Sequence, residues 1–268
     1  MYRYLLENTM KVYFYMKSNF YMKSKLLYLL ICISLIACNT EESLTFETLT
    51  ISNDACENCT SVSIEIPKAL GQIKLSETIN IALQEEIIAL LNFDEESNAQ
   101  TIEGASEAFV KDYEELNGKF PEESMPWEAK INGTIIFENM EVLTIKLESY
   151  MYTGGAHGYD TNRFLNFDKT KEVELDRLEL FKNEDEFKAF TETIFRKQEN
   201  VPTDATINST GFMFETESFY LPENIGYTDK GLLLFYEPYE IASFADGPII
   251  LTIPYNDANN FLKISVKP

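Results

Sequence analysis

Apolar and polar positions alternate over much of the chain, a pattern that predicts strands. Leu44–Ser52 and Ser61–Ile66 alternate or carry β-branched residues. They are predicted as the first two strands, and Pro67 is expected to end the second because proline cannot donate to a sheet.

Two helices are predicted after these strands. In the first, apolar residues recur at three- and four-residue spacing from Ile79 to Leu90, and Ser76 is a candidate cap. The second is expected to begin after Ser106 and to stop at Gly118. The apolar stripes of both helices are interpreted as core faces.

A long antiparallel hairpin is predicted at the centre of the chain. Alternation runs through Trp127–Phe137, a polar turn follows, and alternation resumes over Leu143–Leu147. The next segment, Tyr152–Gly158, contains three glycines and the chain's one histidine. Because glycine permits positive φ and close backbone approach, this density predicts a sharply specified loop at the far end of the hairpin.

The C-terminal part is predicted to add shorter elements. Asn183 begins a helix with Glu186 in a capping-box-like arrangement. The remaining predicted elements are the strands Arg163–Phe167, Glu172–Leu175, Phe219–Leu221, Leu232–Tyr236 and Ile249–Ile253, and a last helical turn within Asn256–Leu262. Together these elements predict an α+β fold, with helices on one side of an antiparallel sheet and two subdomains, residues 44–158 and 159–268.

The N-terminus has the pattern of an export signal. A basic stretch from Met22 precedes the apolar run Leu26–Ile36, which is too short to span a membrane, and then Ala37 and Cys38. Leu35–Cys38 resembles a bacterial lipobox. We therefore expect residues 1–37 to be a signal peptide, with 1–21 a misassigned start, residues 38–43 to be a lipidated linker, and the protein to be anchored to the bacterial envelope, at the outer membrane.

The charge is strongly acidic, with a formal net charge of −22 that becomes more negative once the basic signal is removed. Such a chain repels nucleic acid and anionic lipid and attracts cationic partners, although solubility alone would also account for the charge.

Cys56 and Cys59 remain after the signal and the lipidated cysteine are set aside. In an exported chain this pair is predicted to form a small structural disulfide rather than a redox or zinc site. No metal site and no cofactor are expected, since one histidine cannot complete a four-ligand zinc centre.

Two loops carry the candidate binding residues. His157 can act as a base or ligand, but no nucleophile motif accompanies it, so structural or binding use is favoured over catalysis. We expect the glycine loop and the Tyr236–Pro248 loop to border one binding face. Its candidate residues are Gly154, Gly155, His157, Gly158, Tyr236, Tyr239, Glu240 and Asp246.

Three stretches resemble one known family: Tyr152–Gly158, the Asp168–Lys171 turn with Leu175–Phe181, and Tyr236–Pro248 followed by Ile253–Tyr255. The resemblance is to the extracytoplasmic domain of the lysozyme-sensing anti-sigma factor and to the accessory, non-catalytic domain of peptidoglycan deacetylases. It implies a non-catalytic domain that recognises a lysozyme-like cationic protein or peptidoglycan.

The departures from these relatives limit what the resemblance implies. A lipobox stands where the anti-sigma factor has a transmembrane helix, so direct sigma-factor control is not expected. Ser243–Pro248 is superficially similar to the Thr-Phe-Asp-Asp-Gly-Pro signature of the deacetylase domain, but Ala245 removes the base and no metal-binding histidine pair exists. Deacetylase activity is therefore excluded, and the alternative to a binding lipoprotein is an envelope glycan hydrolase or esterase whose site carries no recognised motif.

Overall fold

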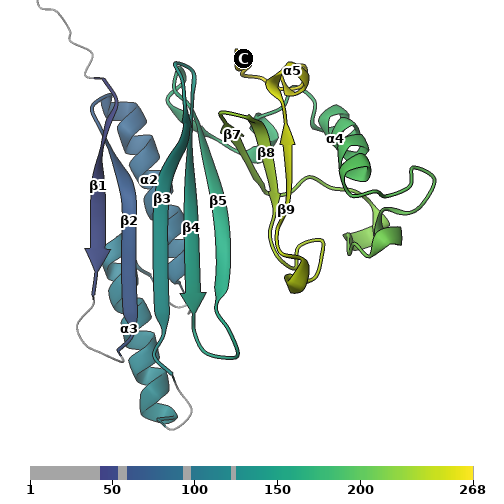
Figure 1. Cartoon of the computed structure of the whole chain (residues 1–268). Helices are drawn as coiled ribbons and strands as arrows, with labels where there is room; N and C mark the ends of the chain where they lie inside the picture. Colours follow the sequence, from purple (N-terminus) through teal and green to yellow (C-terminus); the bar gives the residue numbers. More distant parts are fainter. Residues whose placement is uncertain (1–42, 54–58, 93–97, 122–124, 268) are drawn as a thin grey trace, which may run out of the picture. The chain divides into compact units, whose positions relative to one another are not determined.

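The computed structural model describes residues 43–53, 59–92, 98–121 and 125–267. Its strands form two sheets (Figure 1). The first sheet has six strands in sequence order, β1 Thr45–Ser52, β2 Ser61–Leu70, β3 Glu128–Glu138, β4 Val142–Tyr152, β5 Tyr159–Asp168 and β6 Val173–Leu175. Neighbours are antiparallel except for the parallel pair β2 and β3, which α2 and α3 connect.

The second sheet is antiparallel and has three strands, β7 Asn224–Thr228, β8 Gly231–Tyr236 and β9 Ile249–Ile253. The α-helices are α2 Ile73–Leu91, α3 Ile102–Lys119, α4 Glu184–Gln198 and α5 Tyr255–Ala258. Four 3₁₀ turns complete the elements: η1 Arg177–Glu179, η2 Ile207–Thr210, η3 Glu215–Glu217 and η4 Phe244–Asp246. The predicted α+β class and the central hairpin are confirmed.

Helices α2 and α3 cover one face of the six-stranded sheet (Figure 1). The core beneath them joins strand residues such as Ile64 to helix residues such as Ile79 and Phe109, all of which are fully buried. The apolar stripes read from the sequence are therefore core faces, which the hydrophobic effect stabilises.

A second core forms around β7–β9 and α4, and it includes Phe187, Phe195 and Leu234. β3 contributes to both cores because its register with β4 shifts between Ile135 and Phe137. A bulge of this kind reverses the alternation of side chains. Ile135 accordingly packs with the helix-side core, whereas Phe137 belongs to the second core.

The prediction that Pro67 ends the second strand is wrong, because β2 continues to Leu70. β2 pairs with β3 only as far as Glu65, so Pro67 lies beyond that ladder and faces Thr48 of β1 on its other side. The neighbouring Gly133 makes room for the proline ring, since a Cβ there would lie 2.8 Å from Pro67 Cδ.

The predicted helix ends also need correction. α2 begins after Gln72, and Ser76 lies inside the helix, where its hydroxyl donates to the carbonyl of Ile73. α3 begins earlier than predicted because the Thr101 side chain accepts from the backbone N–H of Gly104, and the helix passes through Gly118 to Lys119.

No strand forms at Phe219–Leu221, and the strand of this region is β7, at Asn224–Thr228. Asn and Gly are disfavoured in strands, but in β7 both residues fit the tertiary packing. Gly226 lies against the six-stranded sheet, where a Cβ would stand 2.8 Å from the Phe164 ring. Asn224 is buried as well.

β5 and β6 belong to the first sheet, so the chain passes to the second sheet only after Leu175. The subdomain boundary predicted from the sequence lies earlier, between residues 158 and 159. One buried side chain joins the two sheets. Asn166 of β5 accepts from the hydroxyl of Thr144 at 2.8 Å and donates to the carbonyl of Ile225 in β7 at 2.8 Å. This polar contact fixes where the second sheet meets the first.

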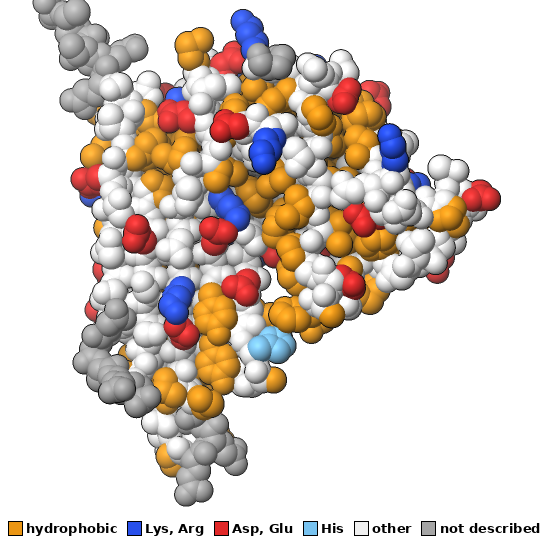
Figure 2. Space-filling model, viewed as in Figure 1, with side chains coloured by type: hydrophobic (Ala, Val, Ile, Leu, Met, Phe, Trp, Pro, Cys, Tyr) orange, Lys and Arg blue, Asp and Glu red, His pale blue; other side chains and the backbone are white. Residues whose placement is uncertain are grey.

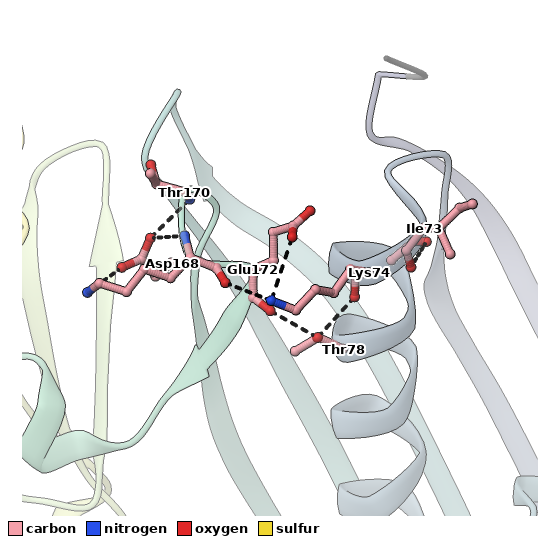
Figure 3. Close-up of polar contacts among 8 residues, drawn as sticks. Ile73, Lys74, Thr78, Asp168, Thr170 and Glu172 are labelled. Atoms are coloured by element: carbon pink, nitrogen blue, oxygen red, sulfur yellow. Dashed lines mark hydrogen bonds and ion pairs between the residues drawn. The ribbon is translucent and has the colours of Figure 1, made fainter. Parts of the chain in front are cut away.

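The turn between β5 and β6 is closed by Asp168, a buried carboxylate (Figure 3). Its Oδ1 accepts from the backbone N–H groups of Thr170 and Lys171 at 3.0 and 2.9 Å, and its Oδ2 lies 2.9 Å from Lys171 Nζ. Burial raises the pKa of Asp168, but the Lys171 ammonium and the two N–H groups outweigh it and hold that pKa below its ordinary value.

The same turn is attached to helix α2. The amine of Lys74 donates to the carbonyl of Lys171, and the hydroxyl of Thr78 donates to the carbonyl of Glu172 (Figure 3). The Asp168–Lys171 motif therefore has a structural role, linking the sheet to the start of the helix.

Replacing Asp168 with alanine should lower the free energy of unfolding at neutral pH by about 2 kcal/mol, because two N–H groups lose a charged acceptor. The folded-state pKa is depressed, so this stability is present above the ordinary value of 3.8 and is lost as the pH falls through the folded pKa. Urea unfolding at neutral and acid pH tests this, with Thr170→Ala as an exposed control. A difference that stays constant down to the lowest pH would contradict the account.

Candidate functional site

The glycine loop follows β4 and depends on backbone angles that favour glycine. Gly154 and Gly155 have φ of 107° and 91°. The hydroxyl of Tyr152 donates to the carbonyl of Gly155 at 3.2 Å and so closes the loop onto its own strand. Gly158 is required for a different reason, because a Cβ there would stand 2.6 Å from the ring of Tyr150.

The loop between β8 and β9 is also held in a defined shape. Tyr239 has φ of 70°, a conformation that costs a non-glycine residue about 1 to 3 kcal/mol. Further on, Ser243 and Asp246 form a capping box around η4, with Asp246 Oδ2 accepting from the Ser243 hydroxyl at 2.6 Å. Asp246 thus shapes the loop that presents Phe244.

Four rings from the two loops and the start of β5 form an exposed cluster, the aromatic stack of Tyr239, Phe244, His157 and Tyr159. The His157 ring lies 4.9 Å from that of Phe244 at an interplanar angle of 19°, and the Phe244 ring lies 5.4 Å from that of Tyr239 at 26°. Tyr159 approaches the other side of His157 at 5.4 Å. Residues about 85 positions apart in sequence are therefore brought together, as the predicted common face requires.

The stack is open to solvent. Tyr159 and Tyr239 are each 56% exposed, and Phe244 is 42% exposed. Figure 2 shows the single histidine at the surface with hydrophobic side chains around it. Asp246 of the second loop and Asp160 at the start of β5 are also exposed. Aromatic faces next to carboxylates suit the side chains of arginine and lysine.

His157 is fixed by its own loop. Its Nδ1 lies 2.9 Å from the carbonyl of Gly158, a contact in which the ring nitrogen is the donor. This contact joins two consecutive residues and is local to the loop. The ring is oriented for stacking.

Glu237 and Glu240 anchor the second loop. Glu237 Oε1 accepts from the backbone N–H of Asn162 in β5 at 2.5 Å, and Glu240 Oε2 accepts from the N–H of Glu237 at 2.8 Å. Burial raises the pKa of both carboxyls above the ordinary value, although these hydrogen bonds and Arg163 oppose the rise. Glu240 is therefore a positioning residue, half-buried behind the stack.

Tyr236 is not part of the exposed face, which corrects its place among the candidate binding residues. The side chain is fully buried, and its hydroxyl donates to the carbonyl of Tyr220 at 2.6 Å. Tyr236 ends β8, where alternation places it in the core. Tyr159 and Phe244 lie on the face instead, and neither was among the binding residues predicted from the sequence.

Replacing Glu237 with glutamine should flatten the pH dependence of stability as the pH falls from neutral toward the ordinary carboxyl pKa of 4.5. The folded-state pKa is raised, so the stability that protonation contributes is fully present below the ordinary value of 4.5 and is lost as the pH rises through the folded pKa. Wild-type protein should therefore gain stability on mild acidification, and the variant should gain less. Urea unfolding of both, with exposed Glu65→Gln as control, measures this; equal slopes for all three proteins would contradict it.

Several predicted features involve residues outside the described part of the chain. Cys38 and Cys56 both lie there, so the lipid anchor and the Cys56–Cys59 disulfide stay predictions; Cys59 itself is exposed. Within the described residues, no group of three or more His, Cys, Asp or Glu is arranged to hold a metal ion. None of the helices described has the length and apolar character needed to cross a membrane.

Two family models match the chain. One, described as deacetylase PdaC, matches residues 54–160, and the other, described as DUF3298, a family of unknown function, matches residues 179–256. They confirm the predicted resemblance to domains associated with peptidoglycan deacetylases. The aromatic stack draws His157 and Tyr159 from the first match, and Tyr239 and Phe244 from the second.

Solved structures share the fold. A DUF3298 family protein from Bacteroides fragilis is 21% identical, with a TM-score of 0.66 over 84% of this chain and 96% of that one. Another, from Pseudomonas aeruginosa, is 15% identical, with a TM-score of 0.60 over 84% of this chain and 98% of that one. Among curated proteins, none matches the chain in sequence.

Proposed function

We propose that the chain is a non-catalytic binding protein of the bacterial cell envelope, because family models described as deacetylase PdaC and DUF3298 match two successive parts of it. Both matches are consistent with an accessory domain. In this proposal the lipid on Cys38 holds the protein at the membrane, and the folded part receives a lysozyme-like cationic protein on its aromatic stack.

The observation that supports this proposal most is the stack itself. Exposing four rings to water is unfavourable in free energy, and the positive φ of Tyr239 adds backbone strain. Aromatic residues are the side chains that dominate binding energy at protein interfaces. In addition, one loop lies in the first family match and the other loop lies in the second, and binding sites often form where two domains meet.

Charge favours a basic partner. The whole chain has a net charge of −22, and the exposed Asp160 and Asp246 lie close in sequence to Tyr159 and Phe244 of the stack. The long-range field would speed the encounter, and cation–π contacts with Tyr239 and Phe244 would supply the short-range specificity.

Calorimetric titration of the purified protein with hen-type lysozyme, at low and physiological salt, tests the proposal. A basic protein of similar size and charge but different shape serves as the control. Binding of lysozyme that survives physiological salt, with no such binding of the control, is the expected result. Equal binding of both proteins that disappears with salt would reduce the interaction to unspecific charge attraction and contradict the proposal.

A further inference from the structure

A second recess adjoins the glycine loop and takes no part in the aromatic stack. It is an open pocket of about 450 Å³ between the end of α3 and the loop. The lining comes from the α3 side, from the residue before β3, from the end of β4 and from the loop: Leu116, Phe120, Trp127, Tyr152, Gly154 and Gly155. Its size is within the range of small-ligand sites.

The floor of this pocket is rigid. Trp127 is only 2% exposed, and its ring packs against those of Phe109 at 5.2 Å and Tyr113 at 6.0 Å. By contrast, Phe120 and Met125 at the mouth are each more than half exposed. Flat apolar surfaces are thus available at the mouth without any change in the core.

Polar groups line the loop side of the pocket. The hydroxyl groups of Tyr152 and Thr153 lie there, and the backbone of Gly154 and Gly155 is uncovered, since a Cβ on either would meet no atom within 4 Å. None of the pocket-lining residues that the structure describes carries a charge. This lining favours a neutral ligand with both flat apolar faces and hydroxyl groups.

We propose that this pocket binds a neutral sugar ring of a glycan. The ring face would lie on the aromatic side chains at the mouth, and its hydroxyl or acetamido groups would contact Tyr152 and the glycine backbone. An apolar side chain from a protein could form no hydrogen bond with the Thr153 hydroxyl or with the glycine backbone. The inference goes beyond the proposed function, because it concerns another ligand and another set of residues.

The chain has a single tryptophan, so the fluorescence of Trp127 reports directly on the pocket. The purified protein is titrated with tri-N-acetylchitotriose, which is neutral, and with its de-N-acetylated triamine, which is cationic. We expect a saturable fluorescence change with the neutral trimer at millimolar concentrations, and a weaker response to the triamine. Phe120→Ala should weaken the neutral response about tenfold, whereas Met140→Ala, on the exposed β3–β4 turn, should leave it unchanged.

Three results would overturn the proposal: no saturable change with the neutral trimer, an equal or stronger response to the triamine, or a response that Phe120→Ala leaves intact. Lysozyme binding is measured separately on the same Phe120→Ala protein. Because Phe120 is outside the aromatic stack, that binding should persist, so failure of the sugar site and failure of the proposed function are distinguishable.

Discussion

Replacing Phe244 with alanine should weaken binding of a lysozyme-like cationic protein about thirtyfold, a loss of about 2 kcal/mol. Phe244 lies between His157 and Tyr239 and contacts both rings. Its removal leaves a gap in the stack and takes away the ring nearest the centre of the proposed interface. Calorimetric titration at physiological salt measures the loss.

Ile250→Ala is the matched control for this substitution. Ile250 is 42% exposed, as Phe244 is, and lies on the adjoining strand β9 outside the stack. It should change the affinity less than about threefold. Both variants should keep the wild-type melting temperature to within a few degrees, because neither residue is in a core. If Phe244→Ala bound as tightly as Ile250→Ala, the stack would not be the binding surface.

The two loops could be predicted from the sequence, but their exposed rings could not. Glycine density marked the first loop, and the tyrosines marked the second. Periodicity does not say which ring of a loop is exposed. Tyr236 was assigned to the loop, although it is the last residue of a predicted strand whose alternation places it in the core. One signal was available for Phe244: it is a lone aromatic residue inside the capping box of Ser243 and Asp246, a turn that faces solvent.

Replacing Asn166 with leucine should lower the free energy of unfolding by about 2 to 4 kcal/mol. Asn166 is buried and bridges Thr144 of β4 to the carbonyl of Ile225 in β7. Leucine has a similar volume but leaves both partners buried without a hydrogen bond. Because β7 pairs with β8, which leads into the loop with Tyr239, the substitution should also weaken ligand binding.

Urea unfolding measures this effect, with Asn132→Leu as the control. Asn132 lies on β3 of the same sheet but is exposed, so its replacement should cost less than about 0.5 kcal/mol. A loss below about 1 kcal/mol for Asn166→Leu would show that this polar contact is not needed to hold the two sheets together.

The fold was predictable where one sheet face is buried and alternation is strict, as in β3 over residues 129–135, before the bulge. It was not predictable where tertiary packing overrides local preference. β7 contains Asn224 and Gly226, residues that disfavour strands, yet close approach to Phe164 requires the glycine. Similarly, Pro67 is tolerated because the β3 ladder has already ended at Glu65.

Hydrogen exchange of the protein, free and saturated with hen-type lysozyme, tests the central claim most directly. The account predicts that binding slows exchange in both loops, at residues 153–159 and 238–247, which bear the rings of the aromatic stack. Protection in only one loop, or protection confined to another surface such as α4, would contradict it.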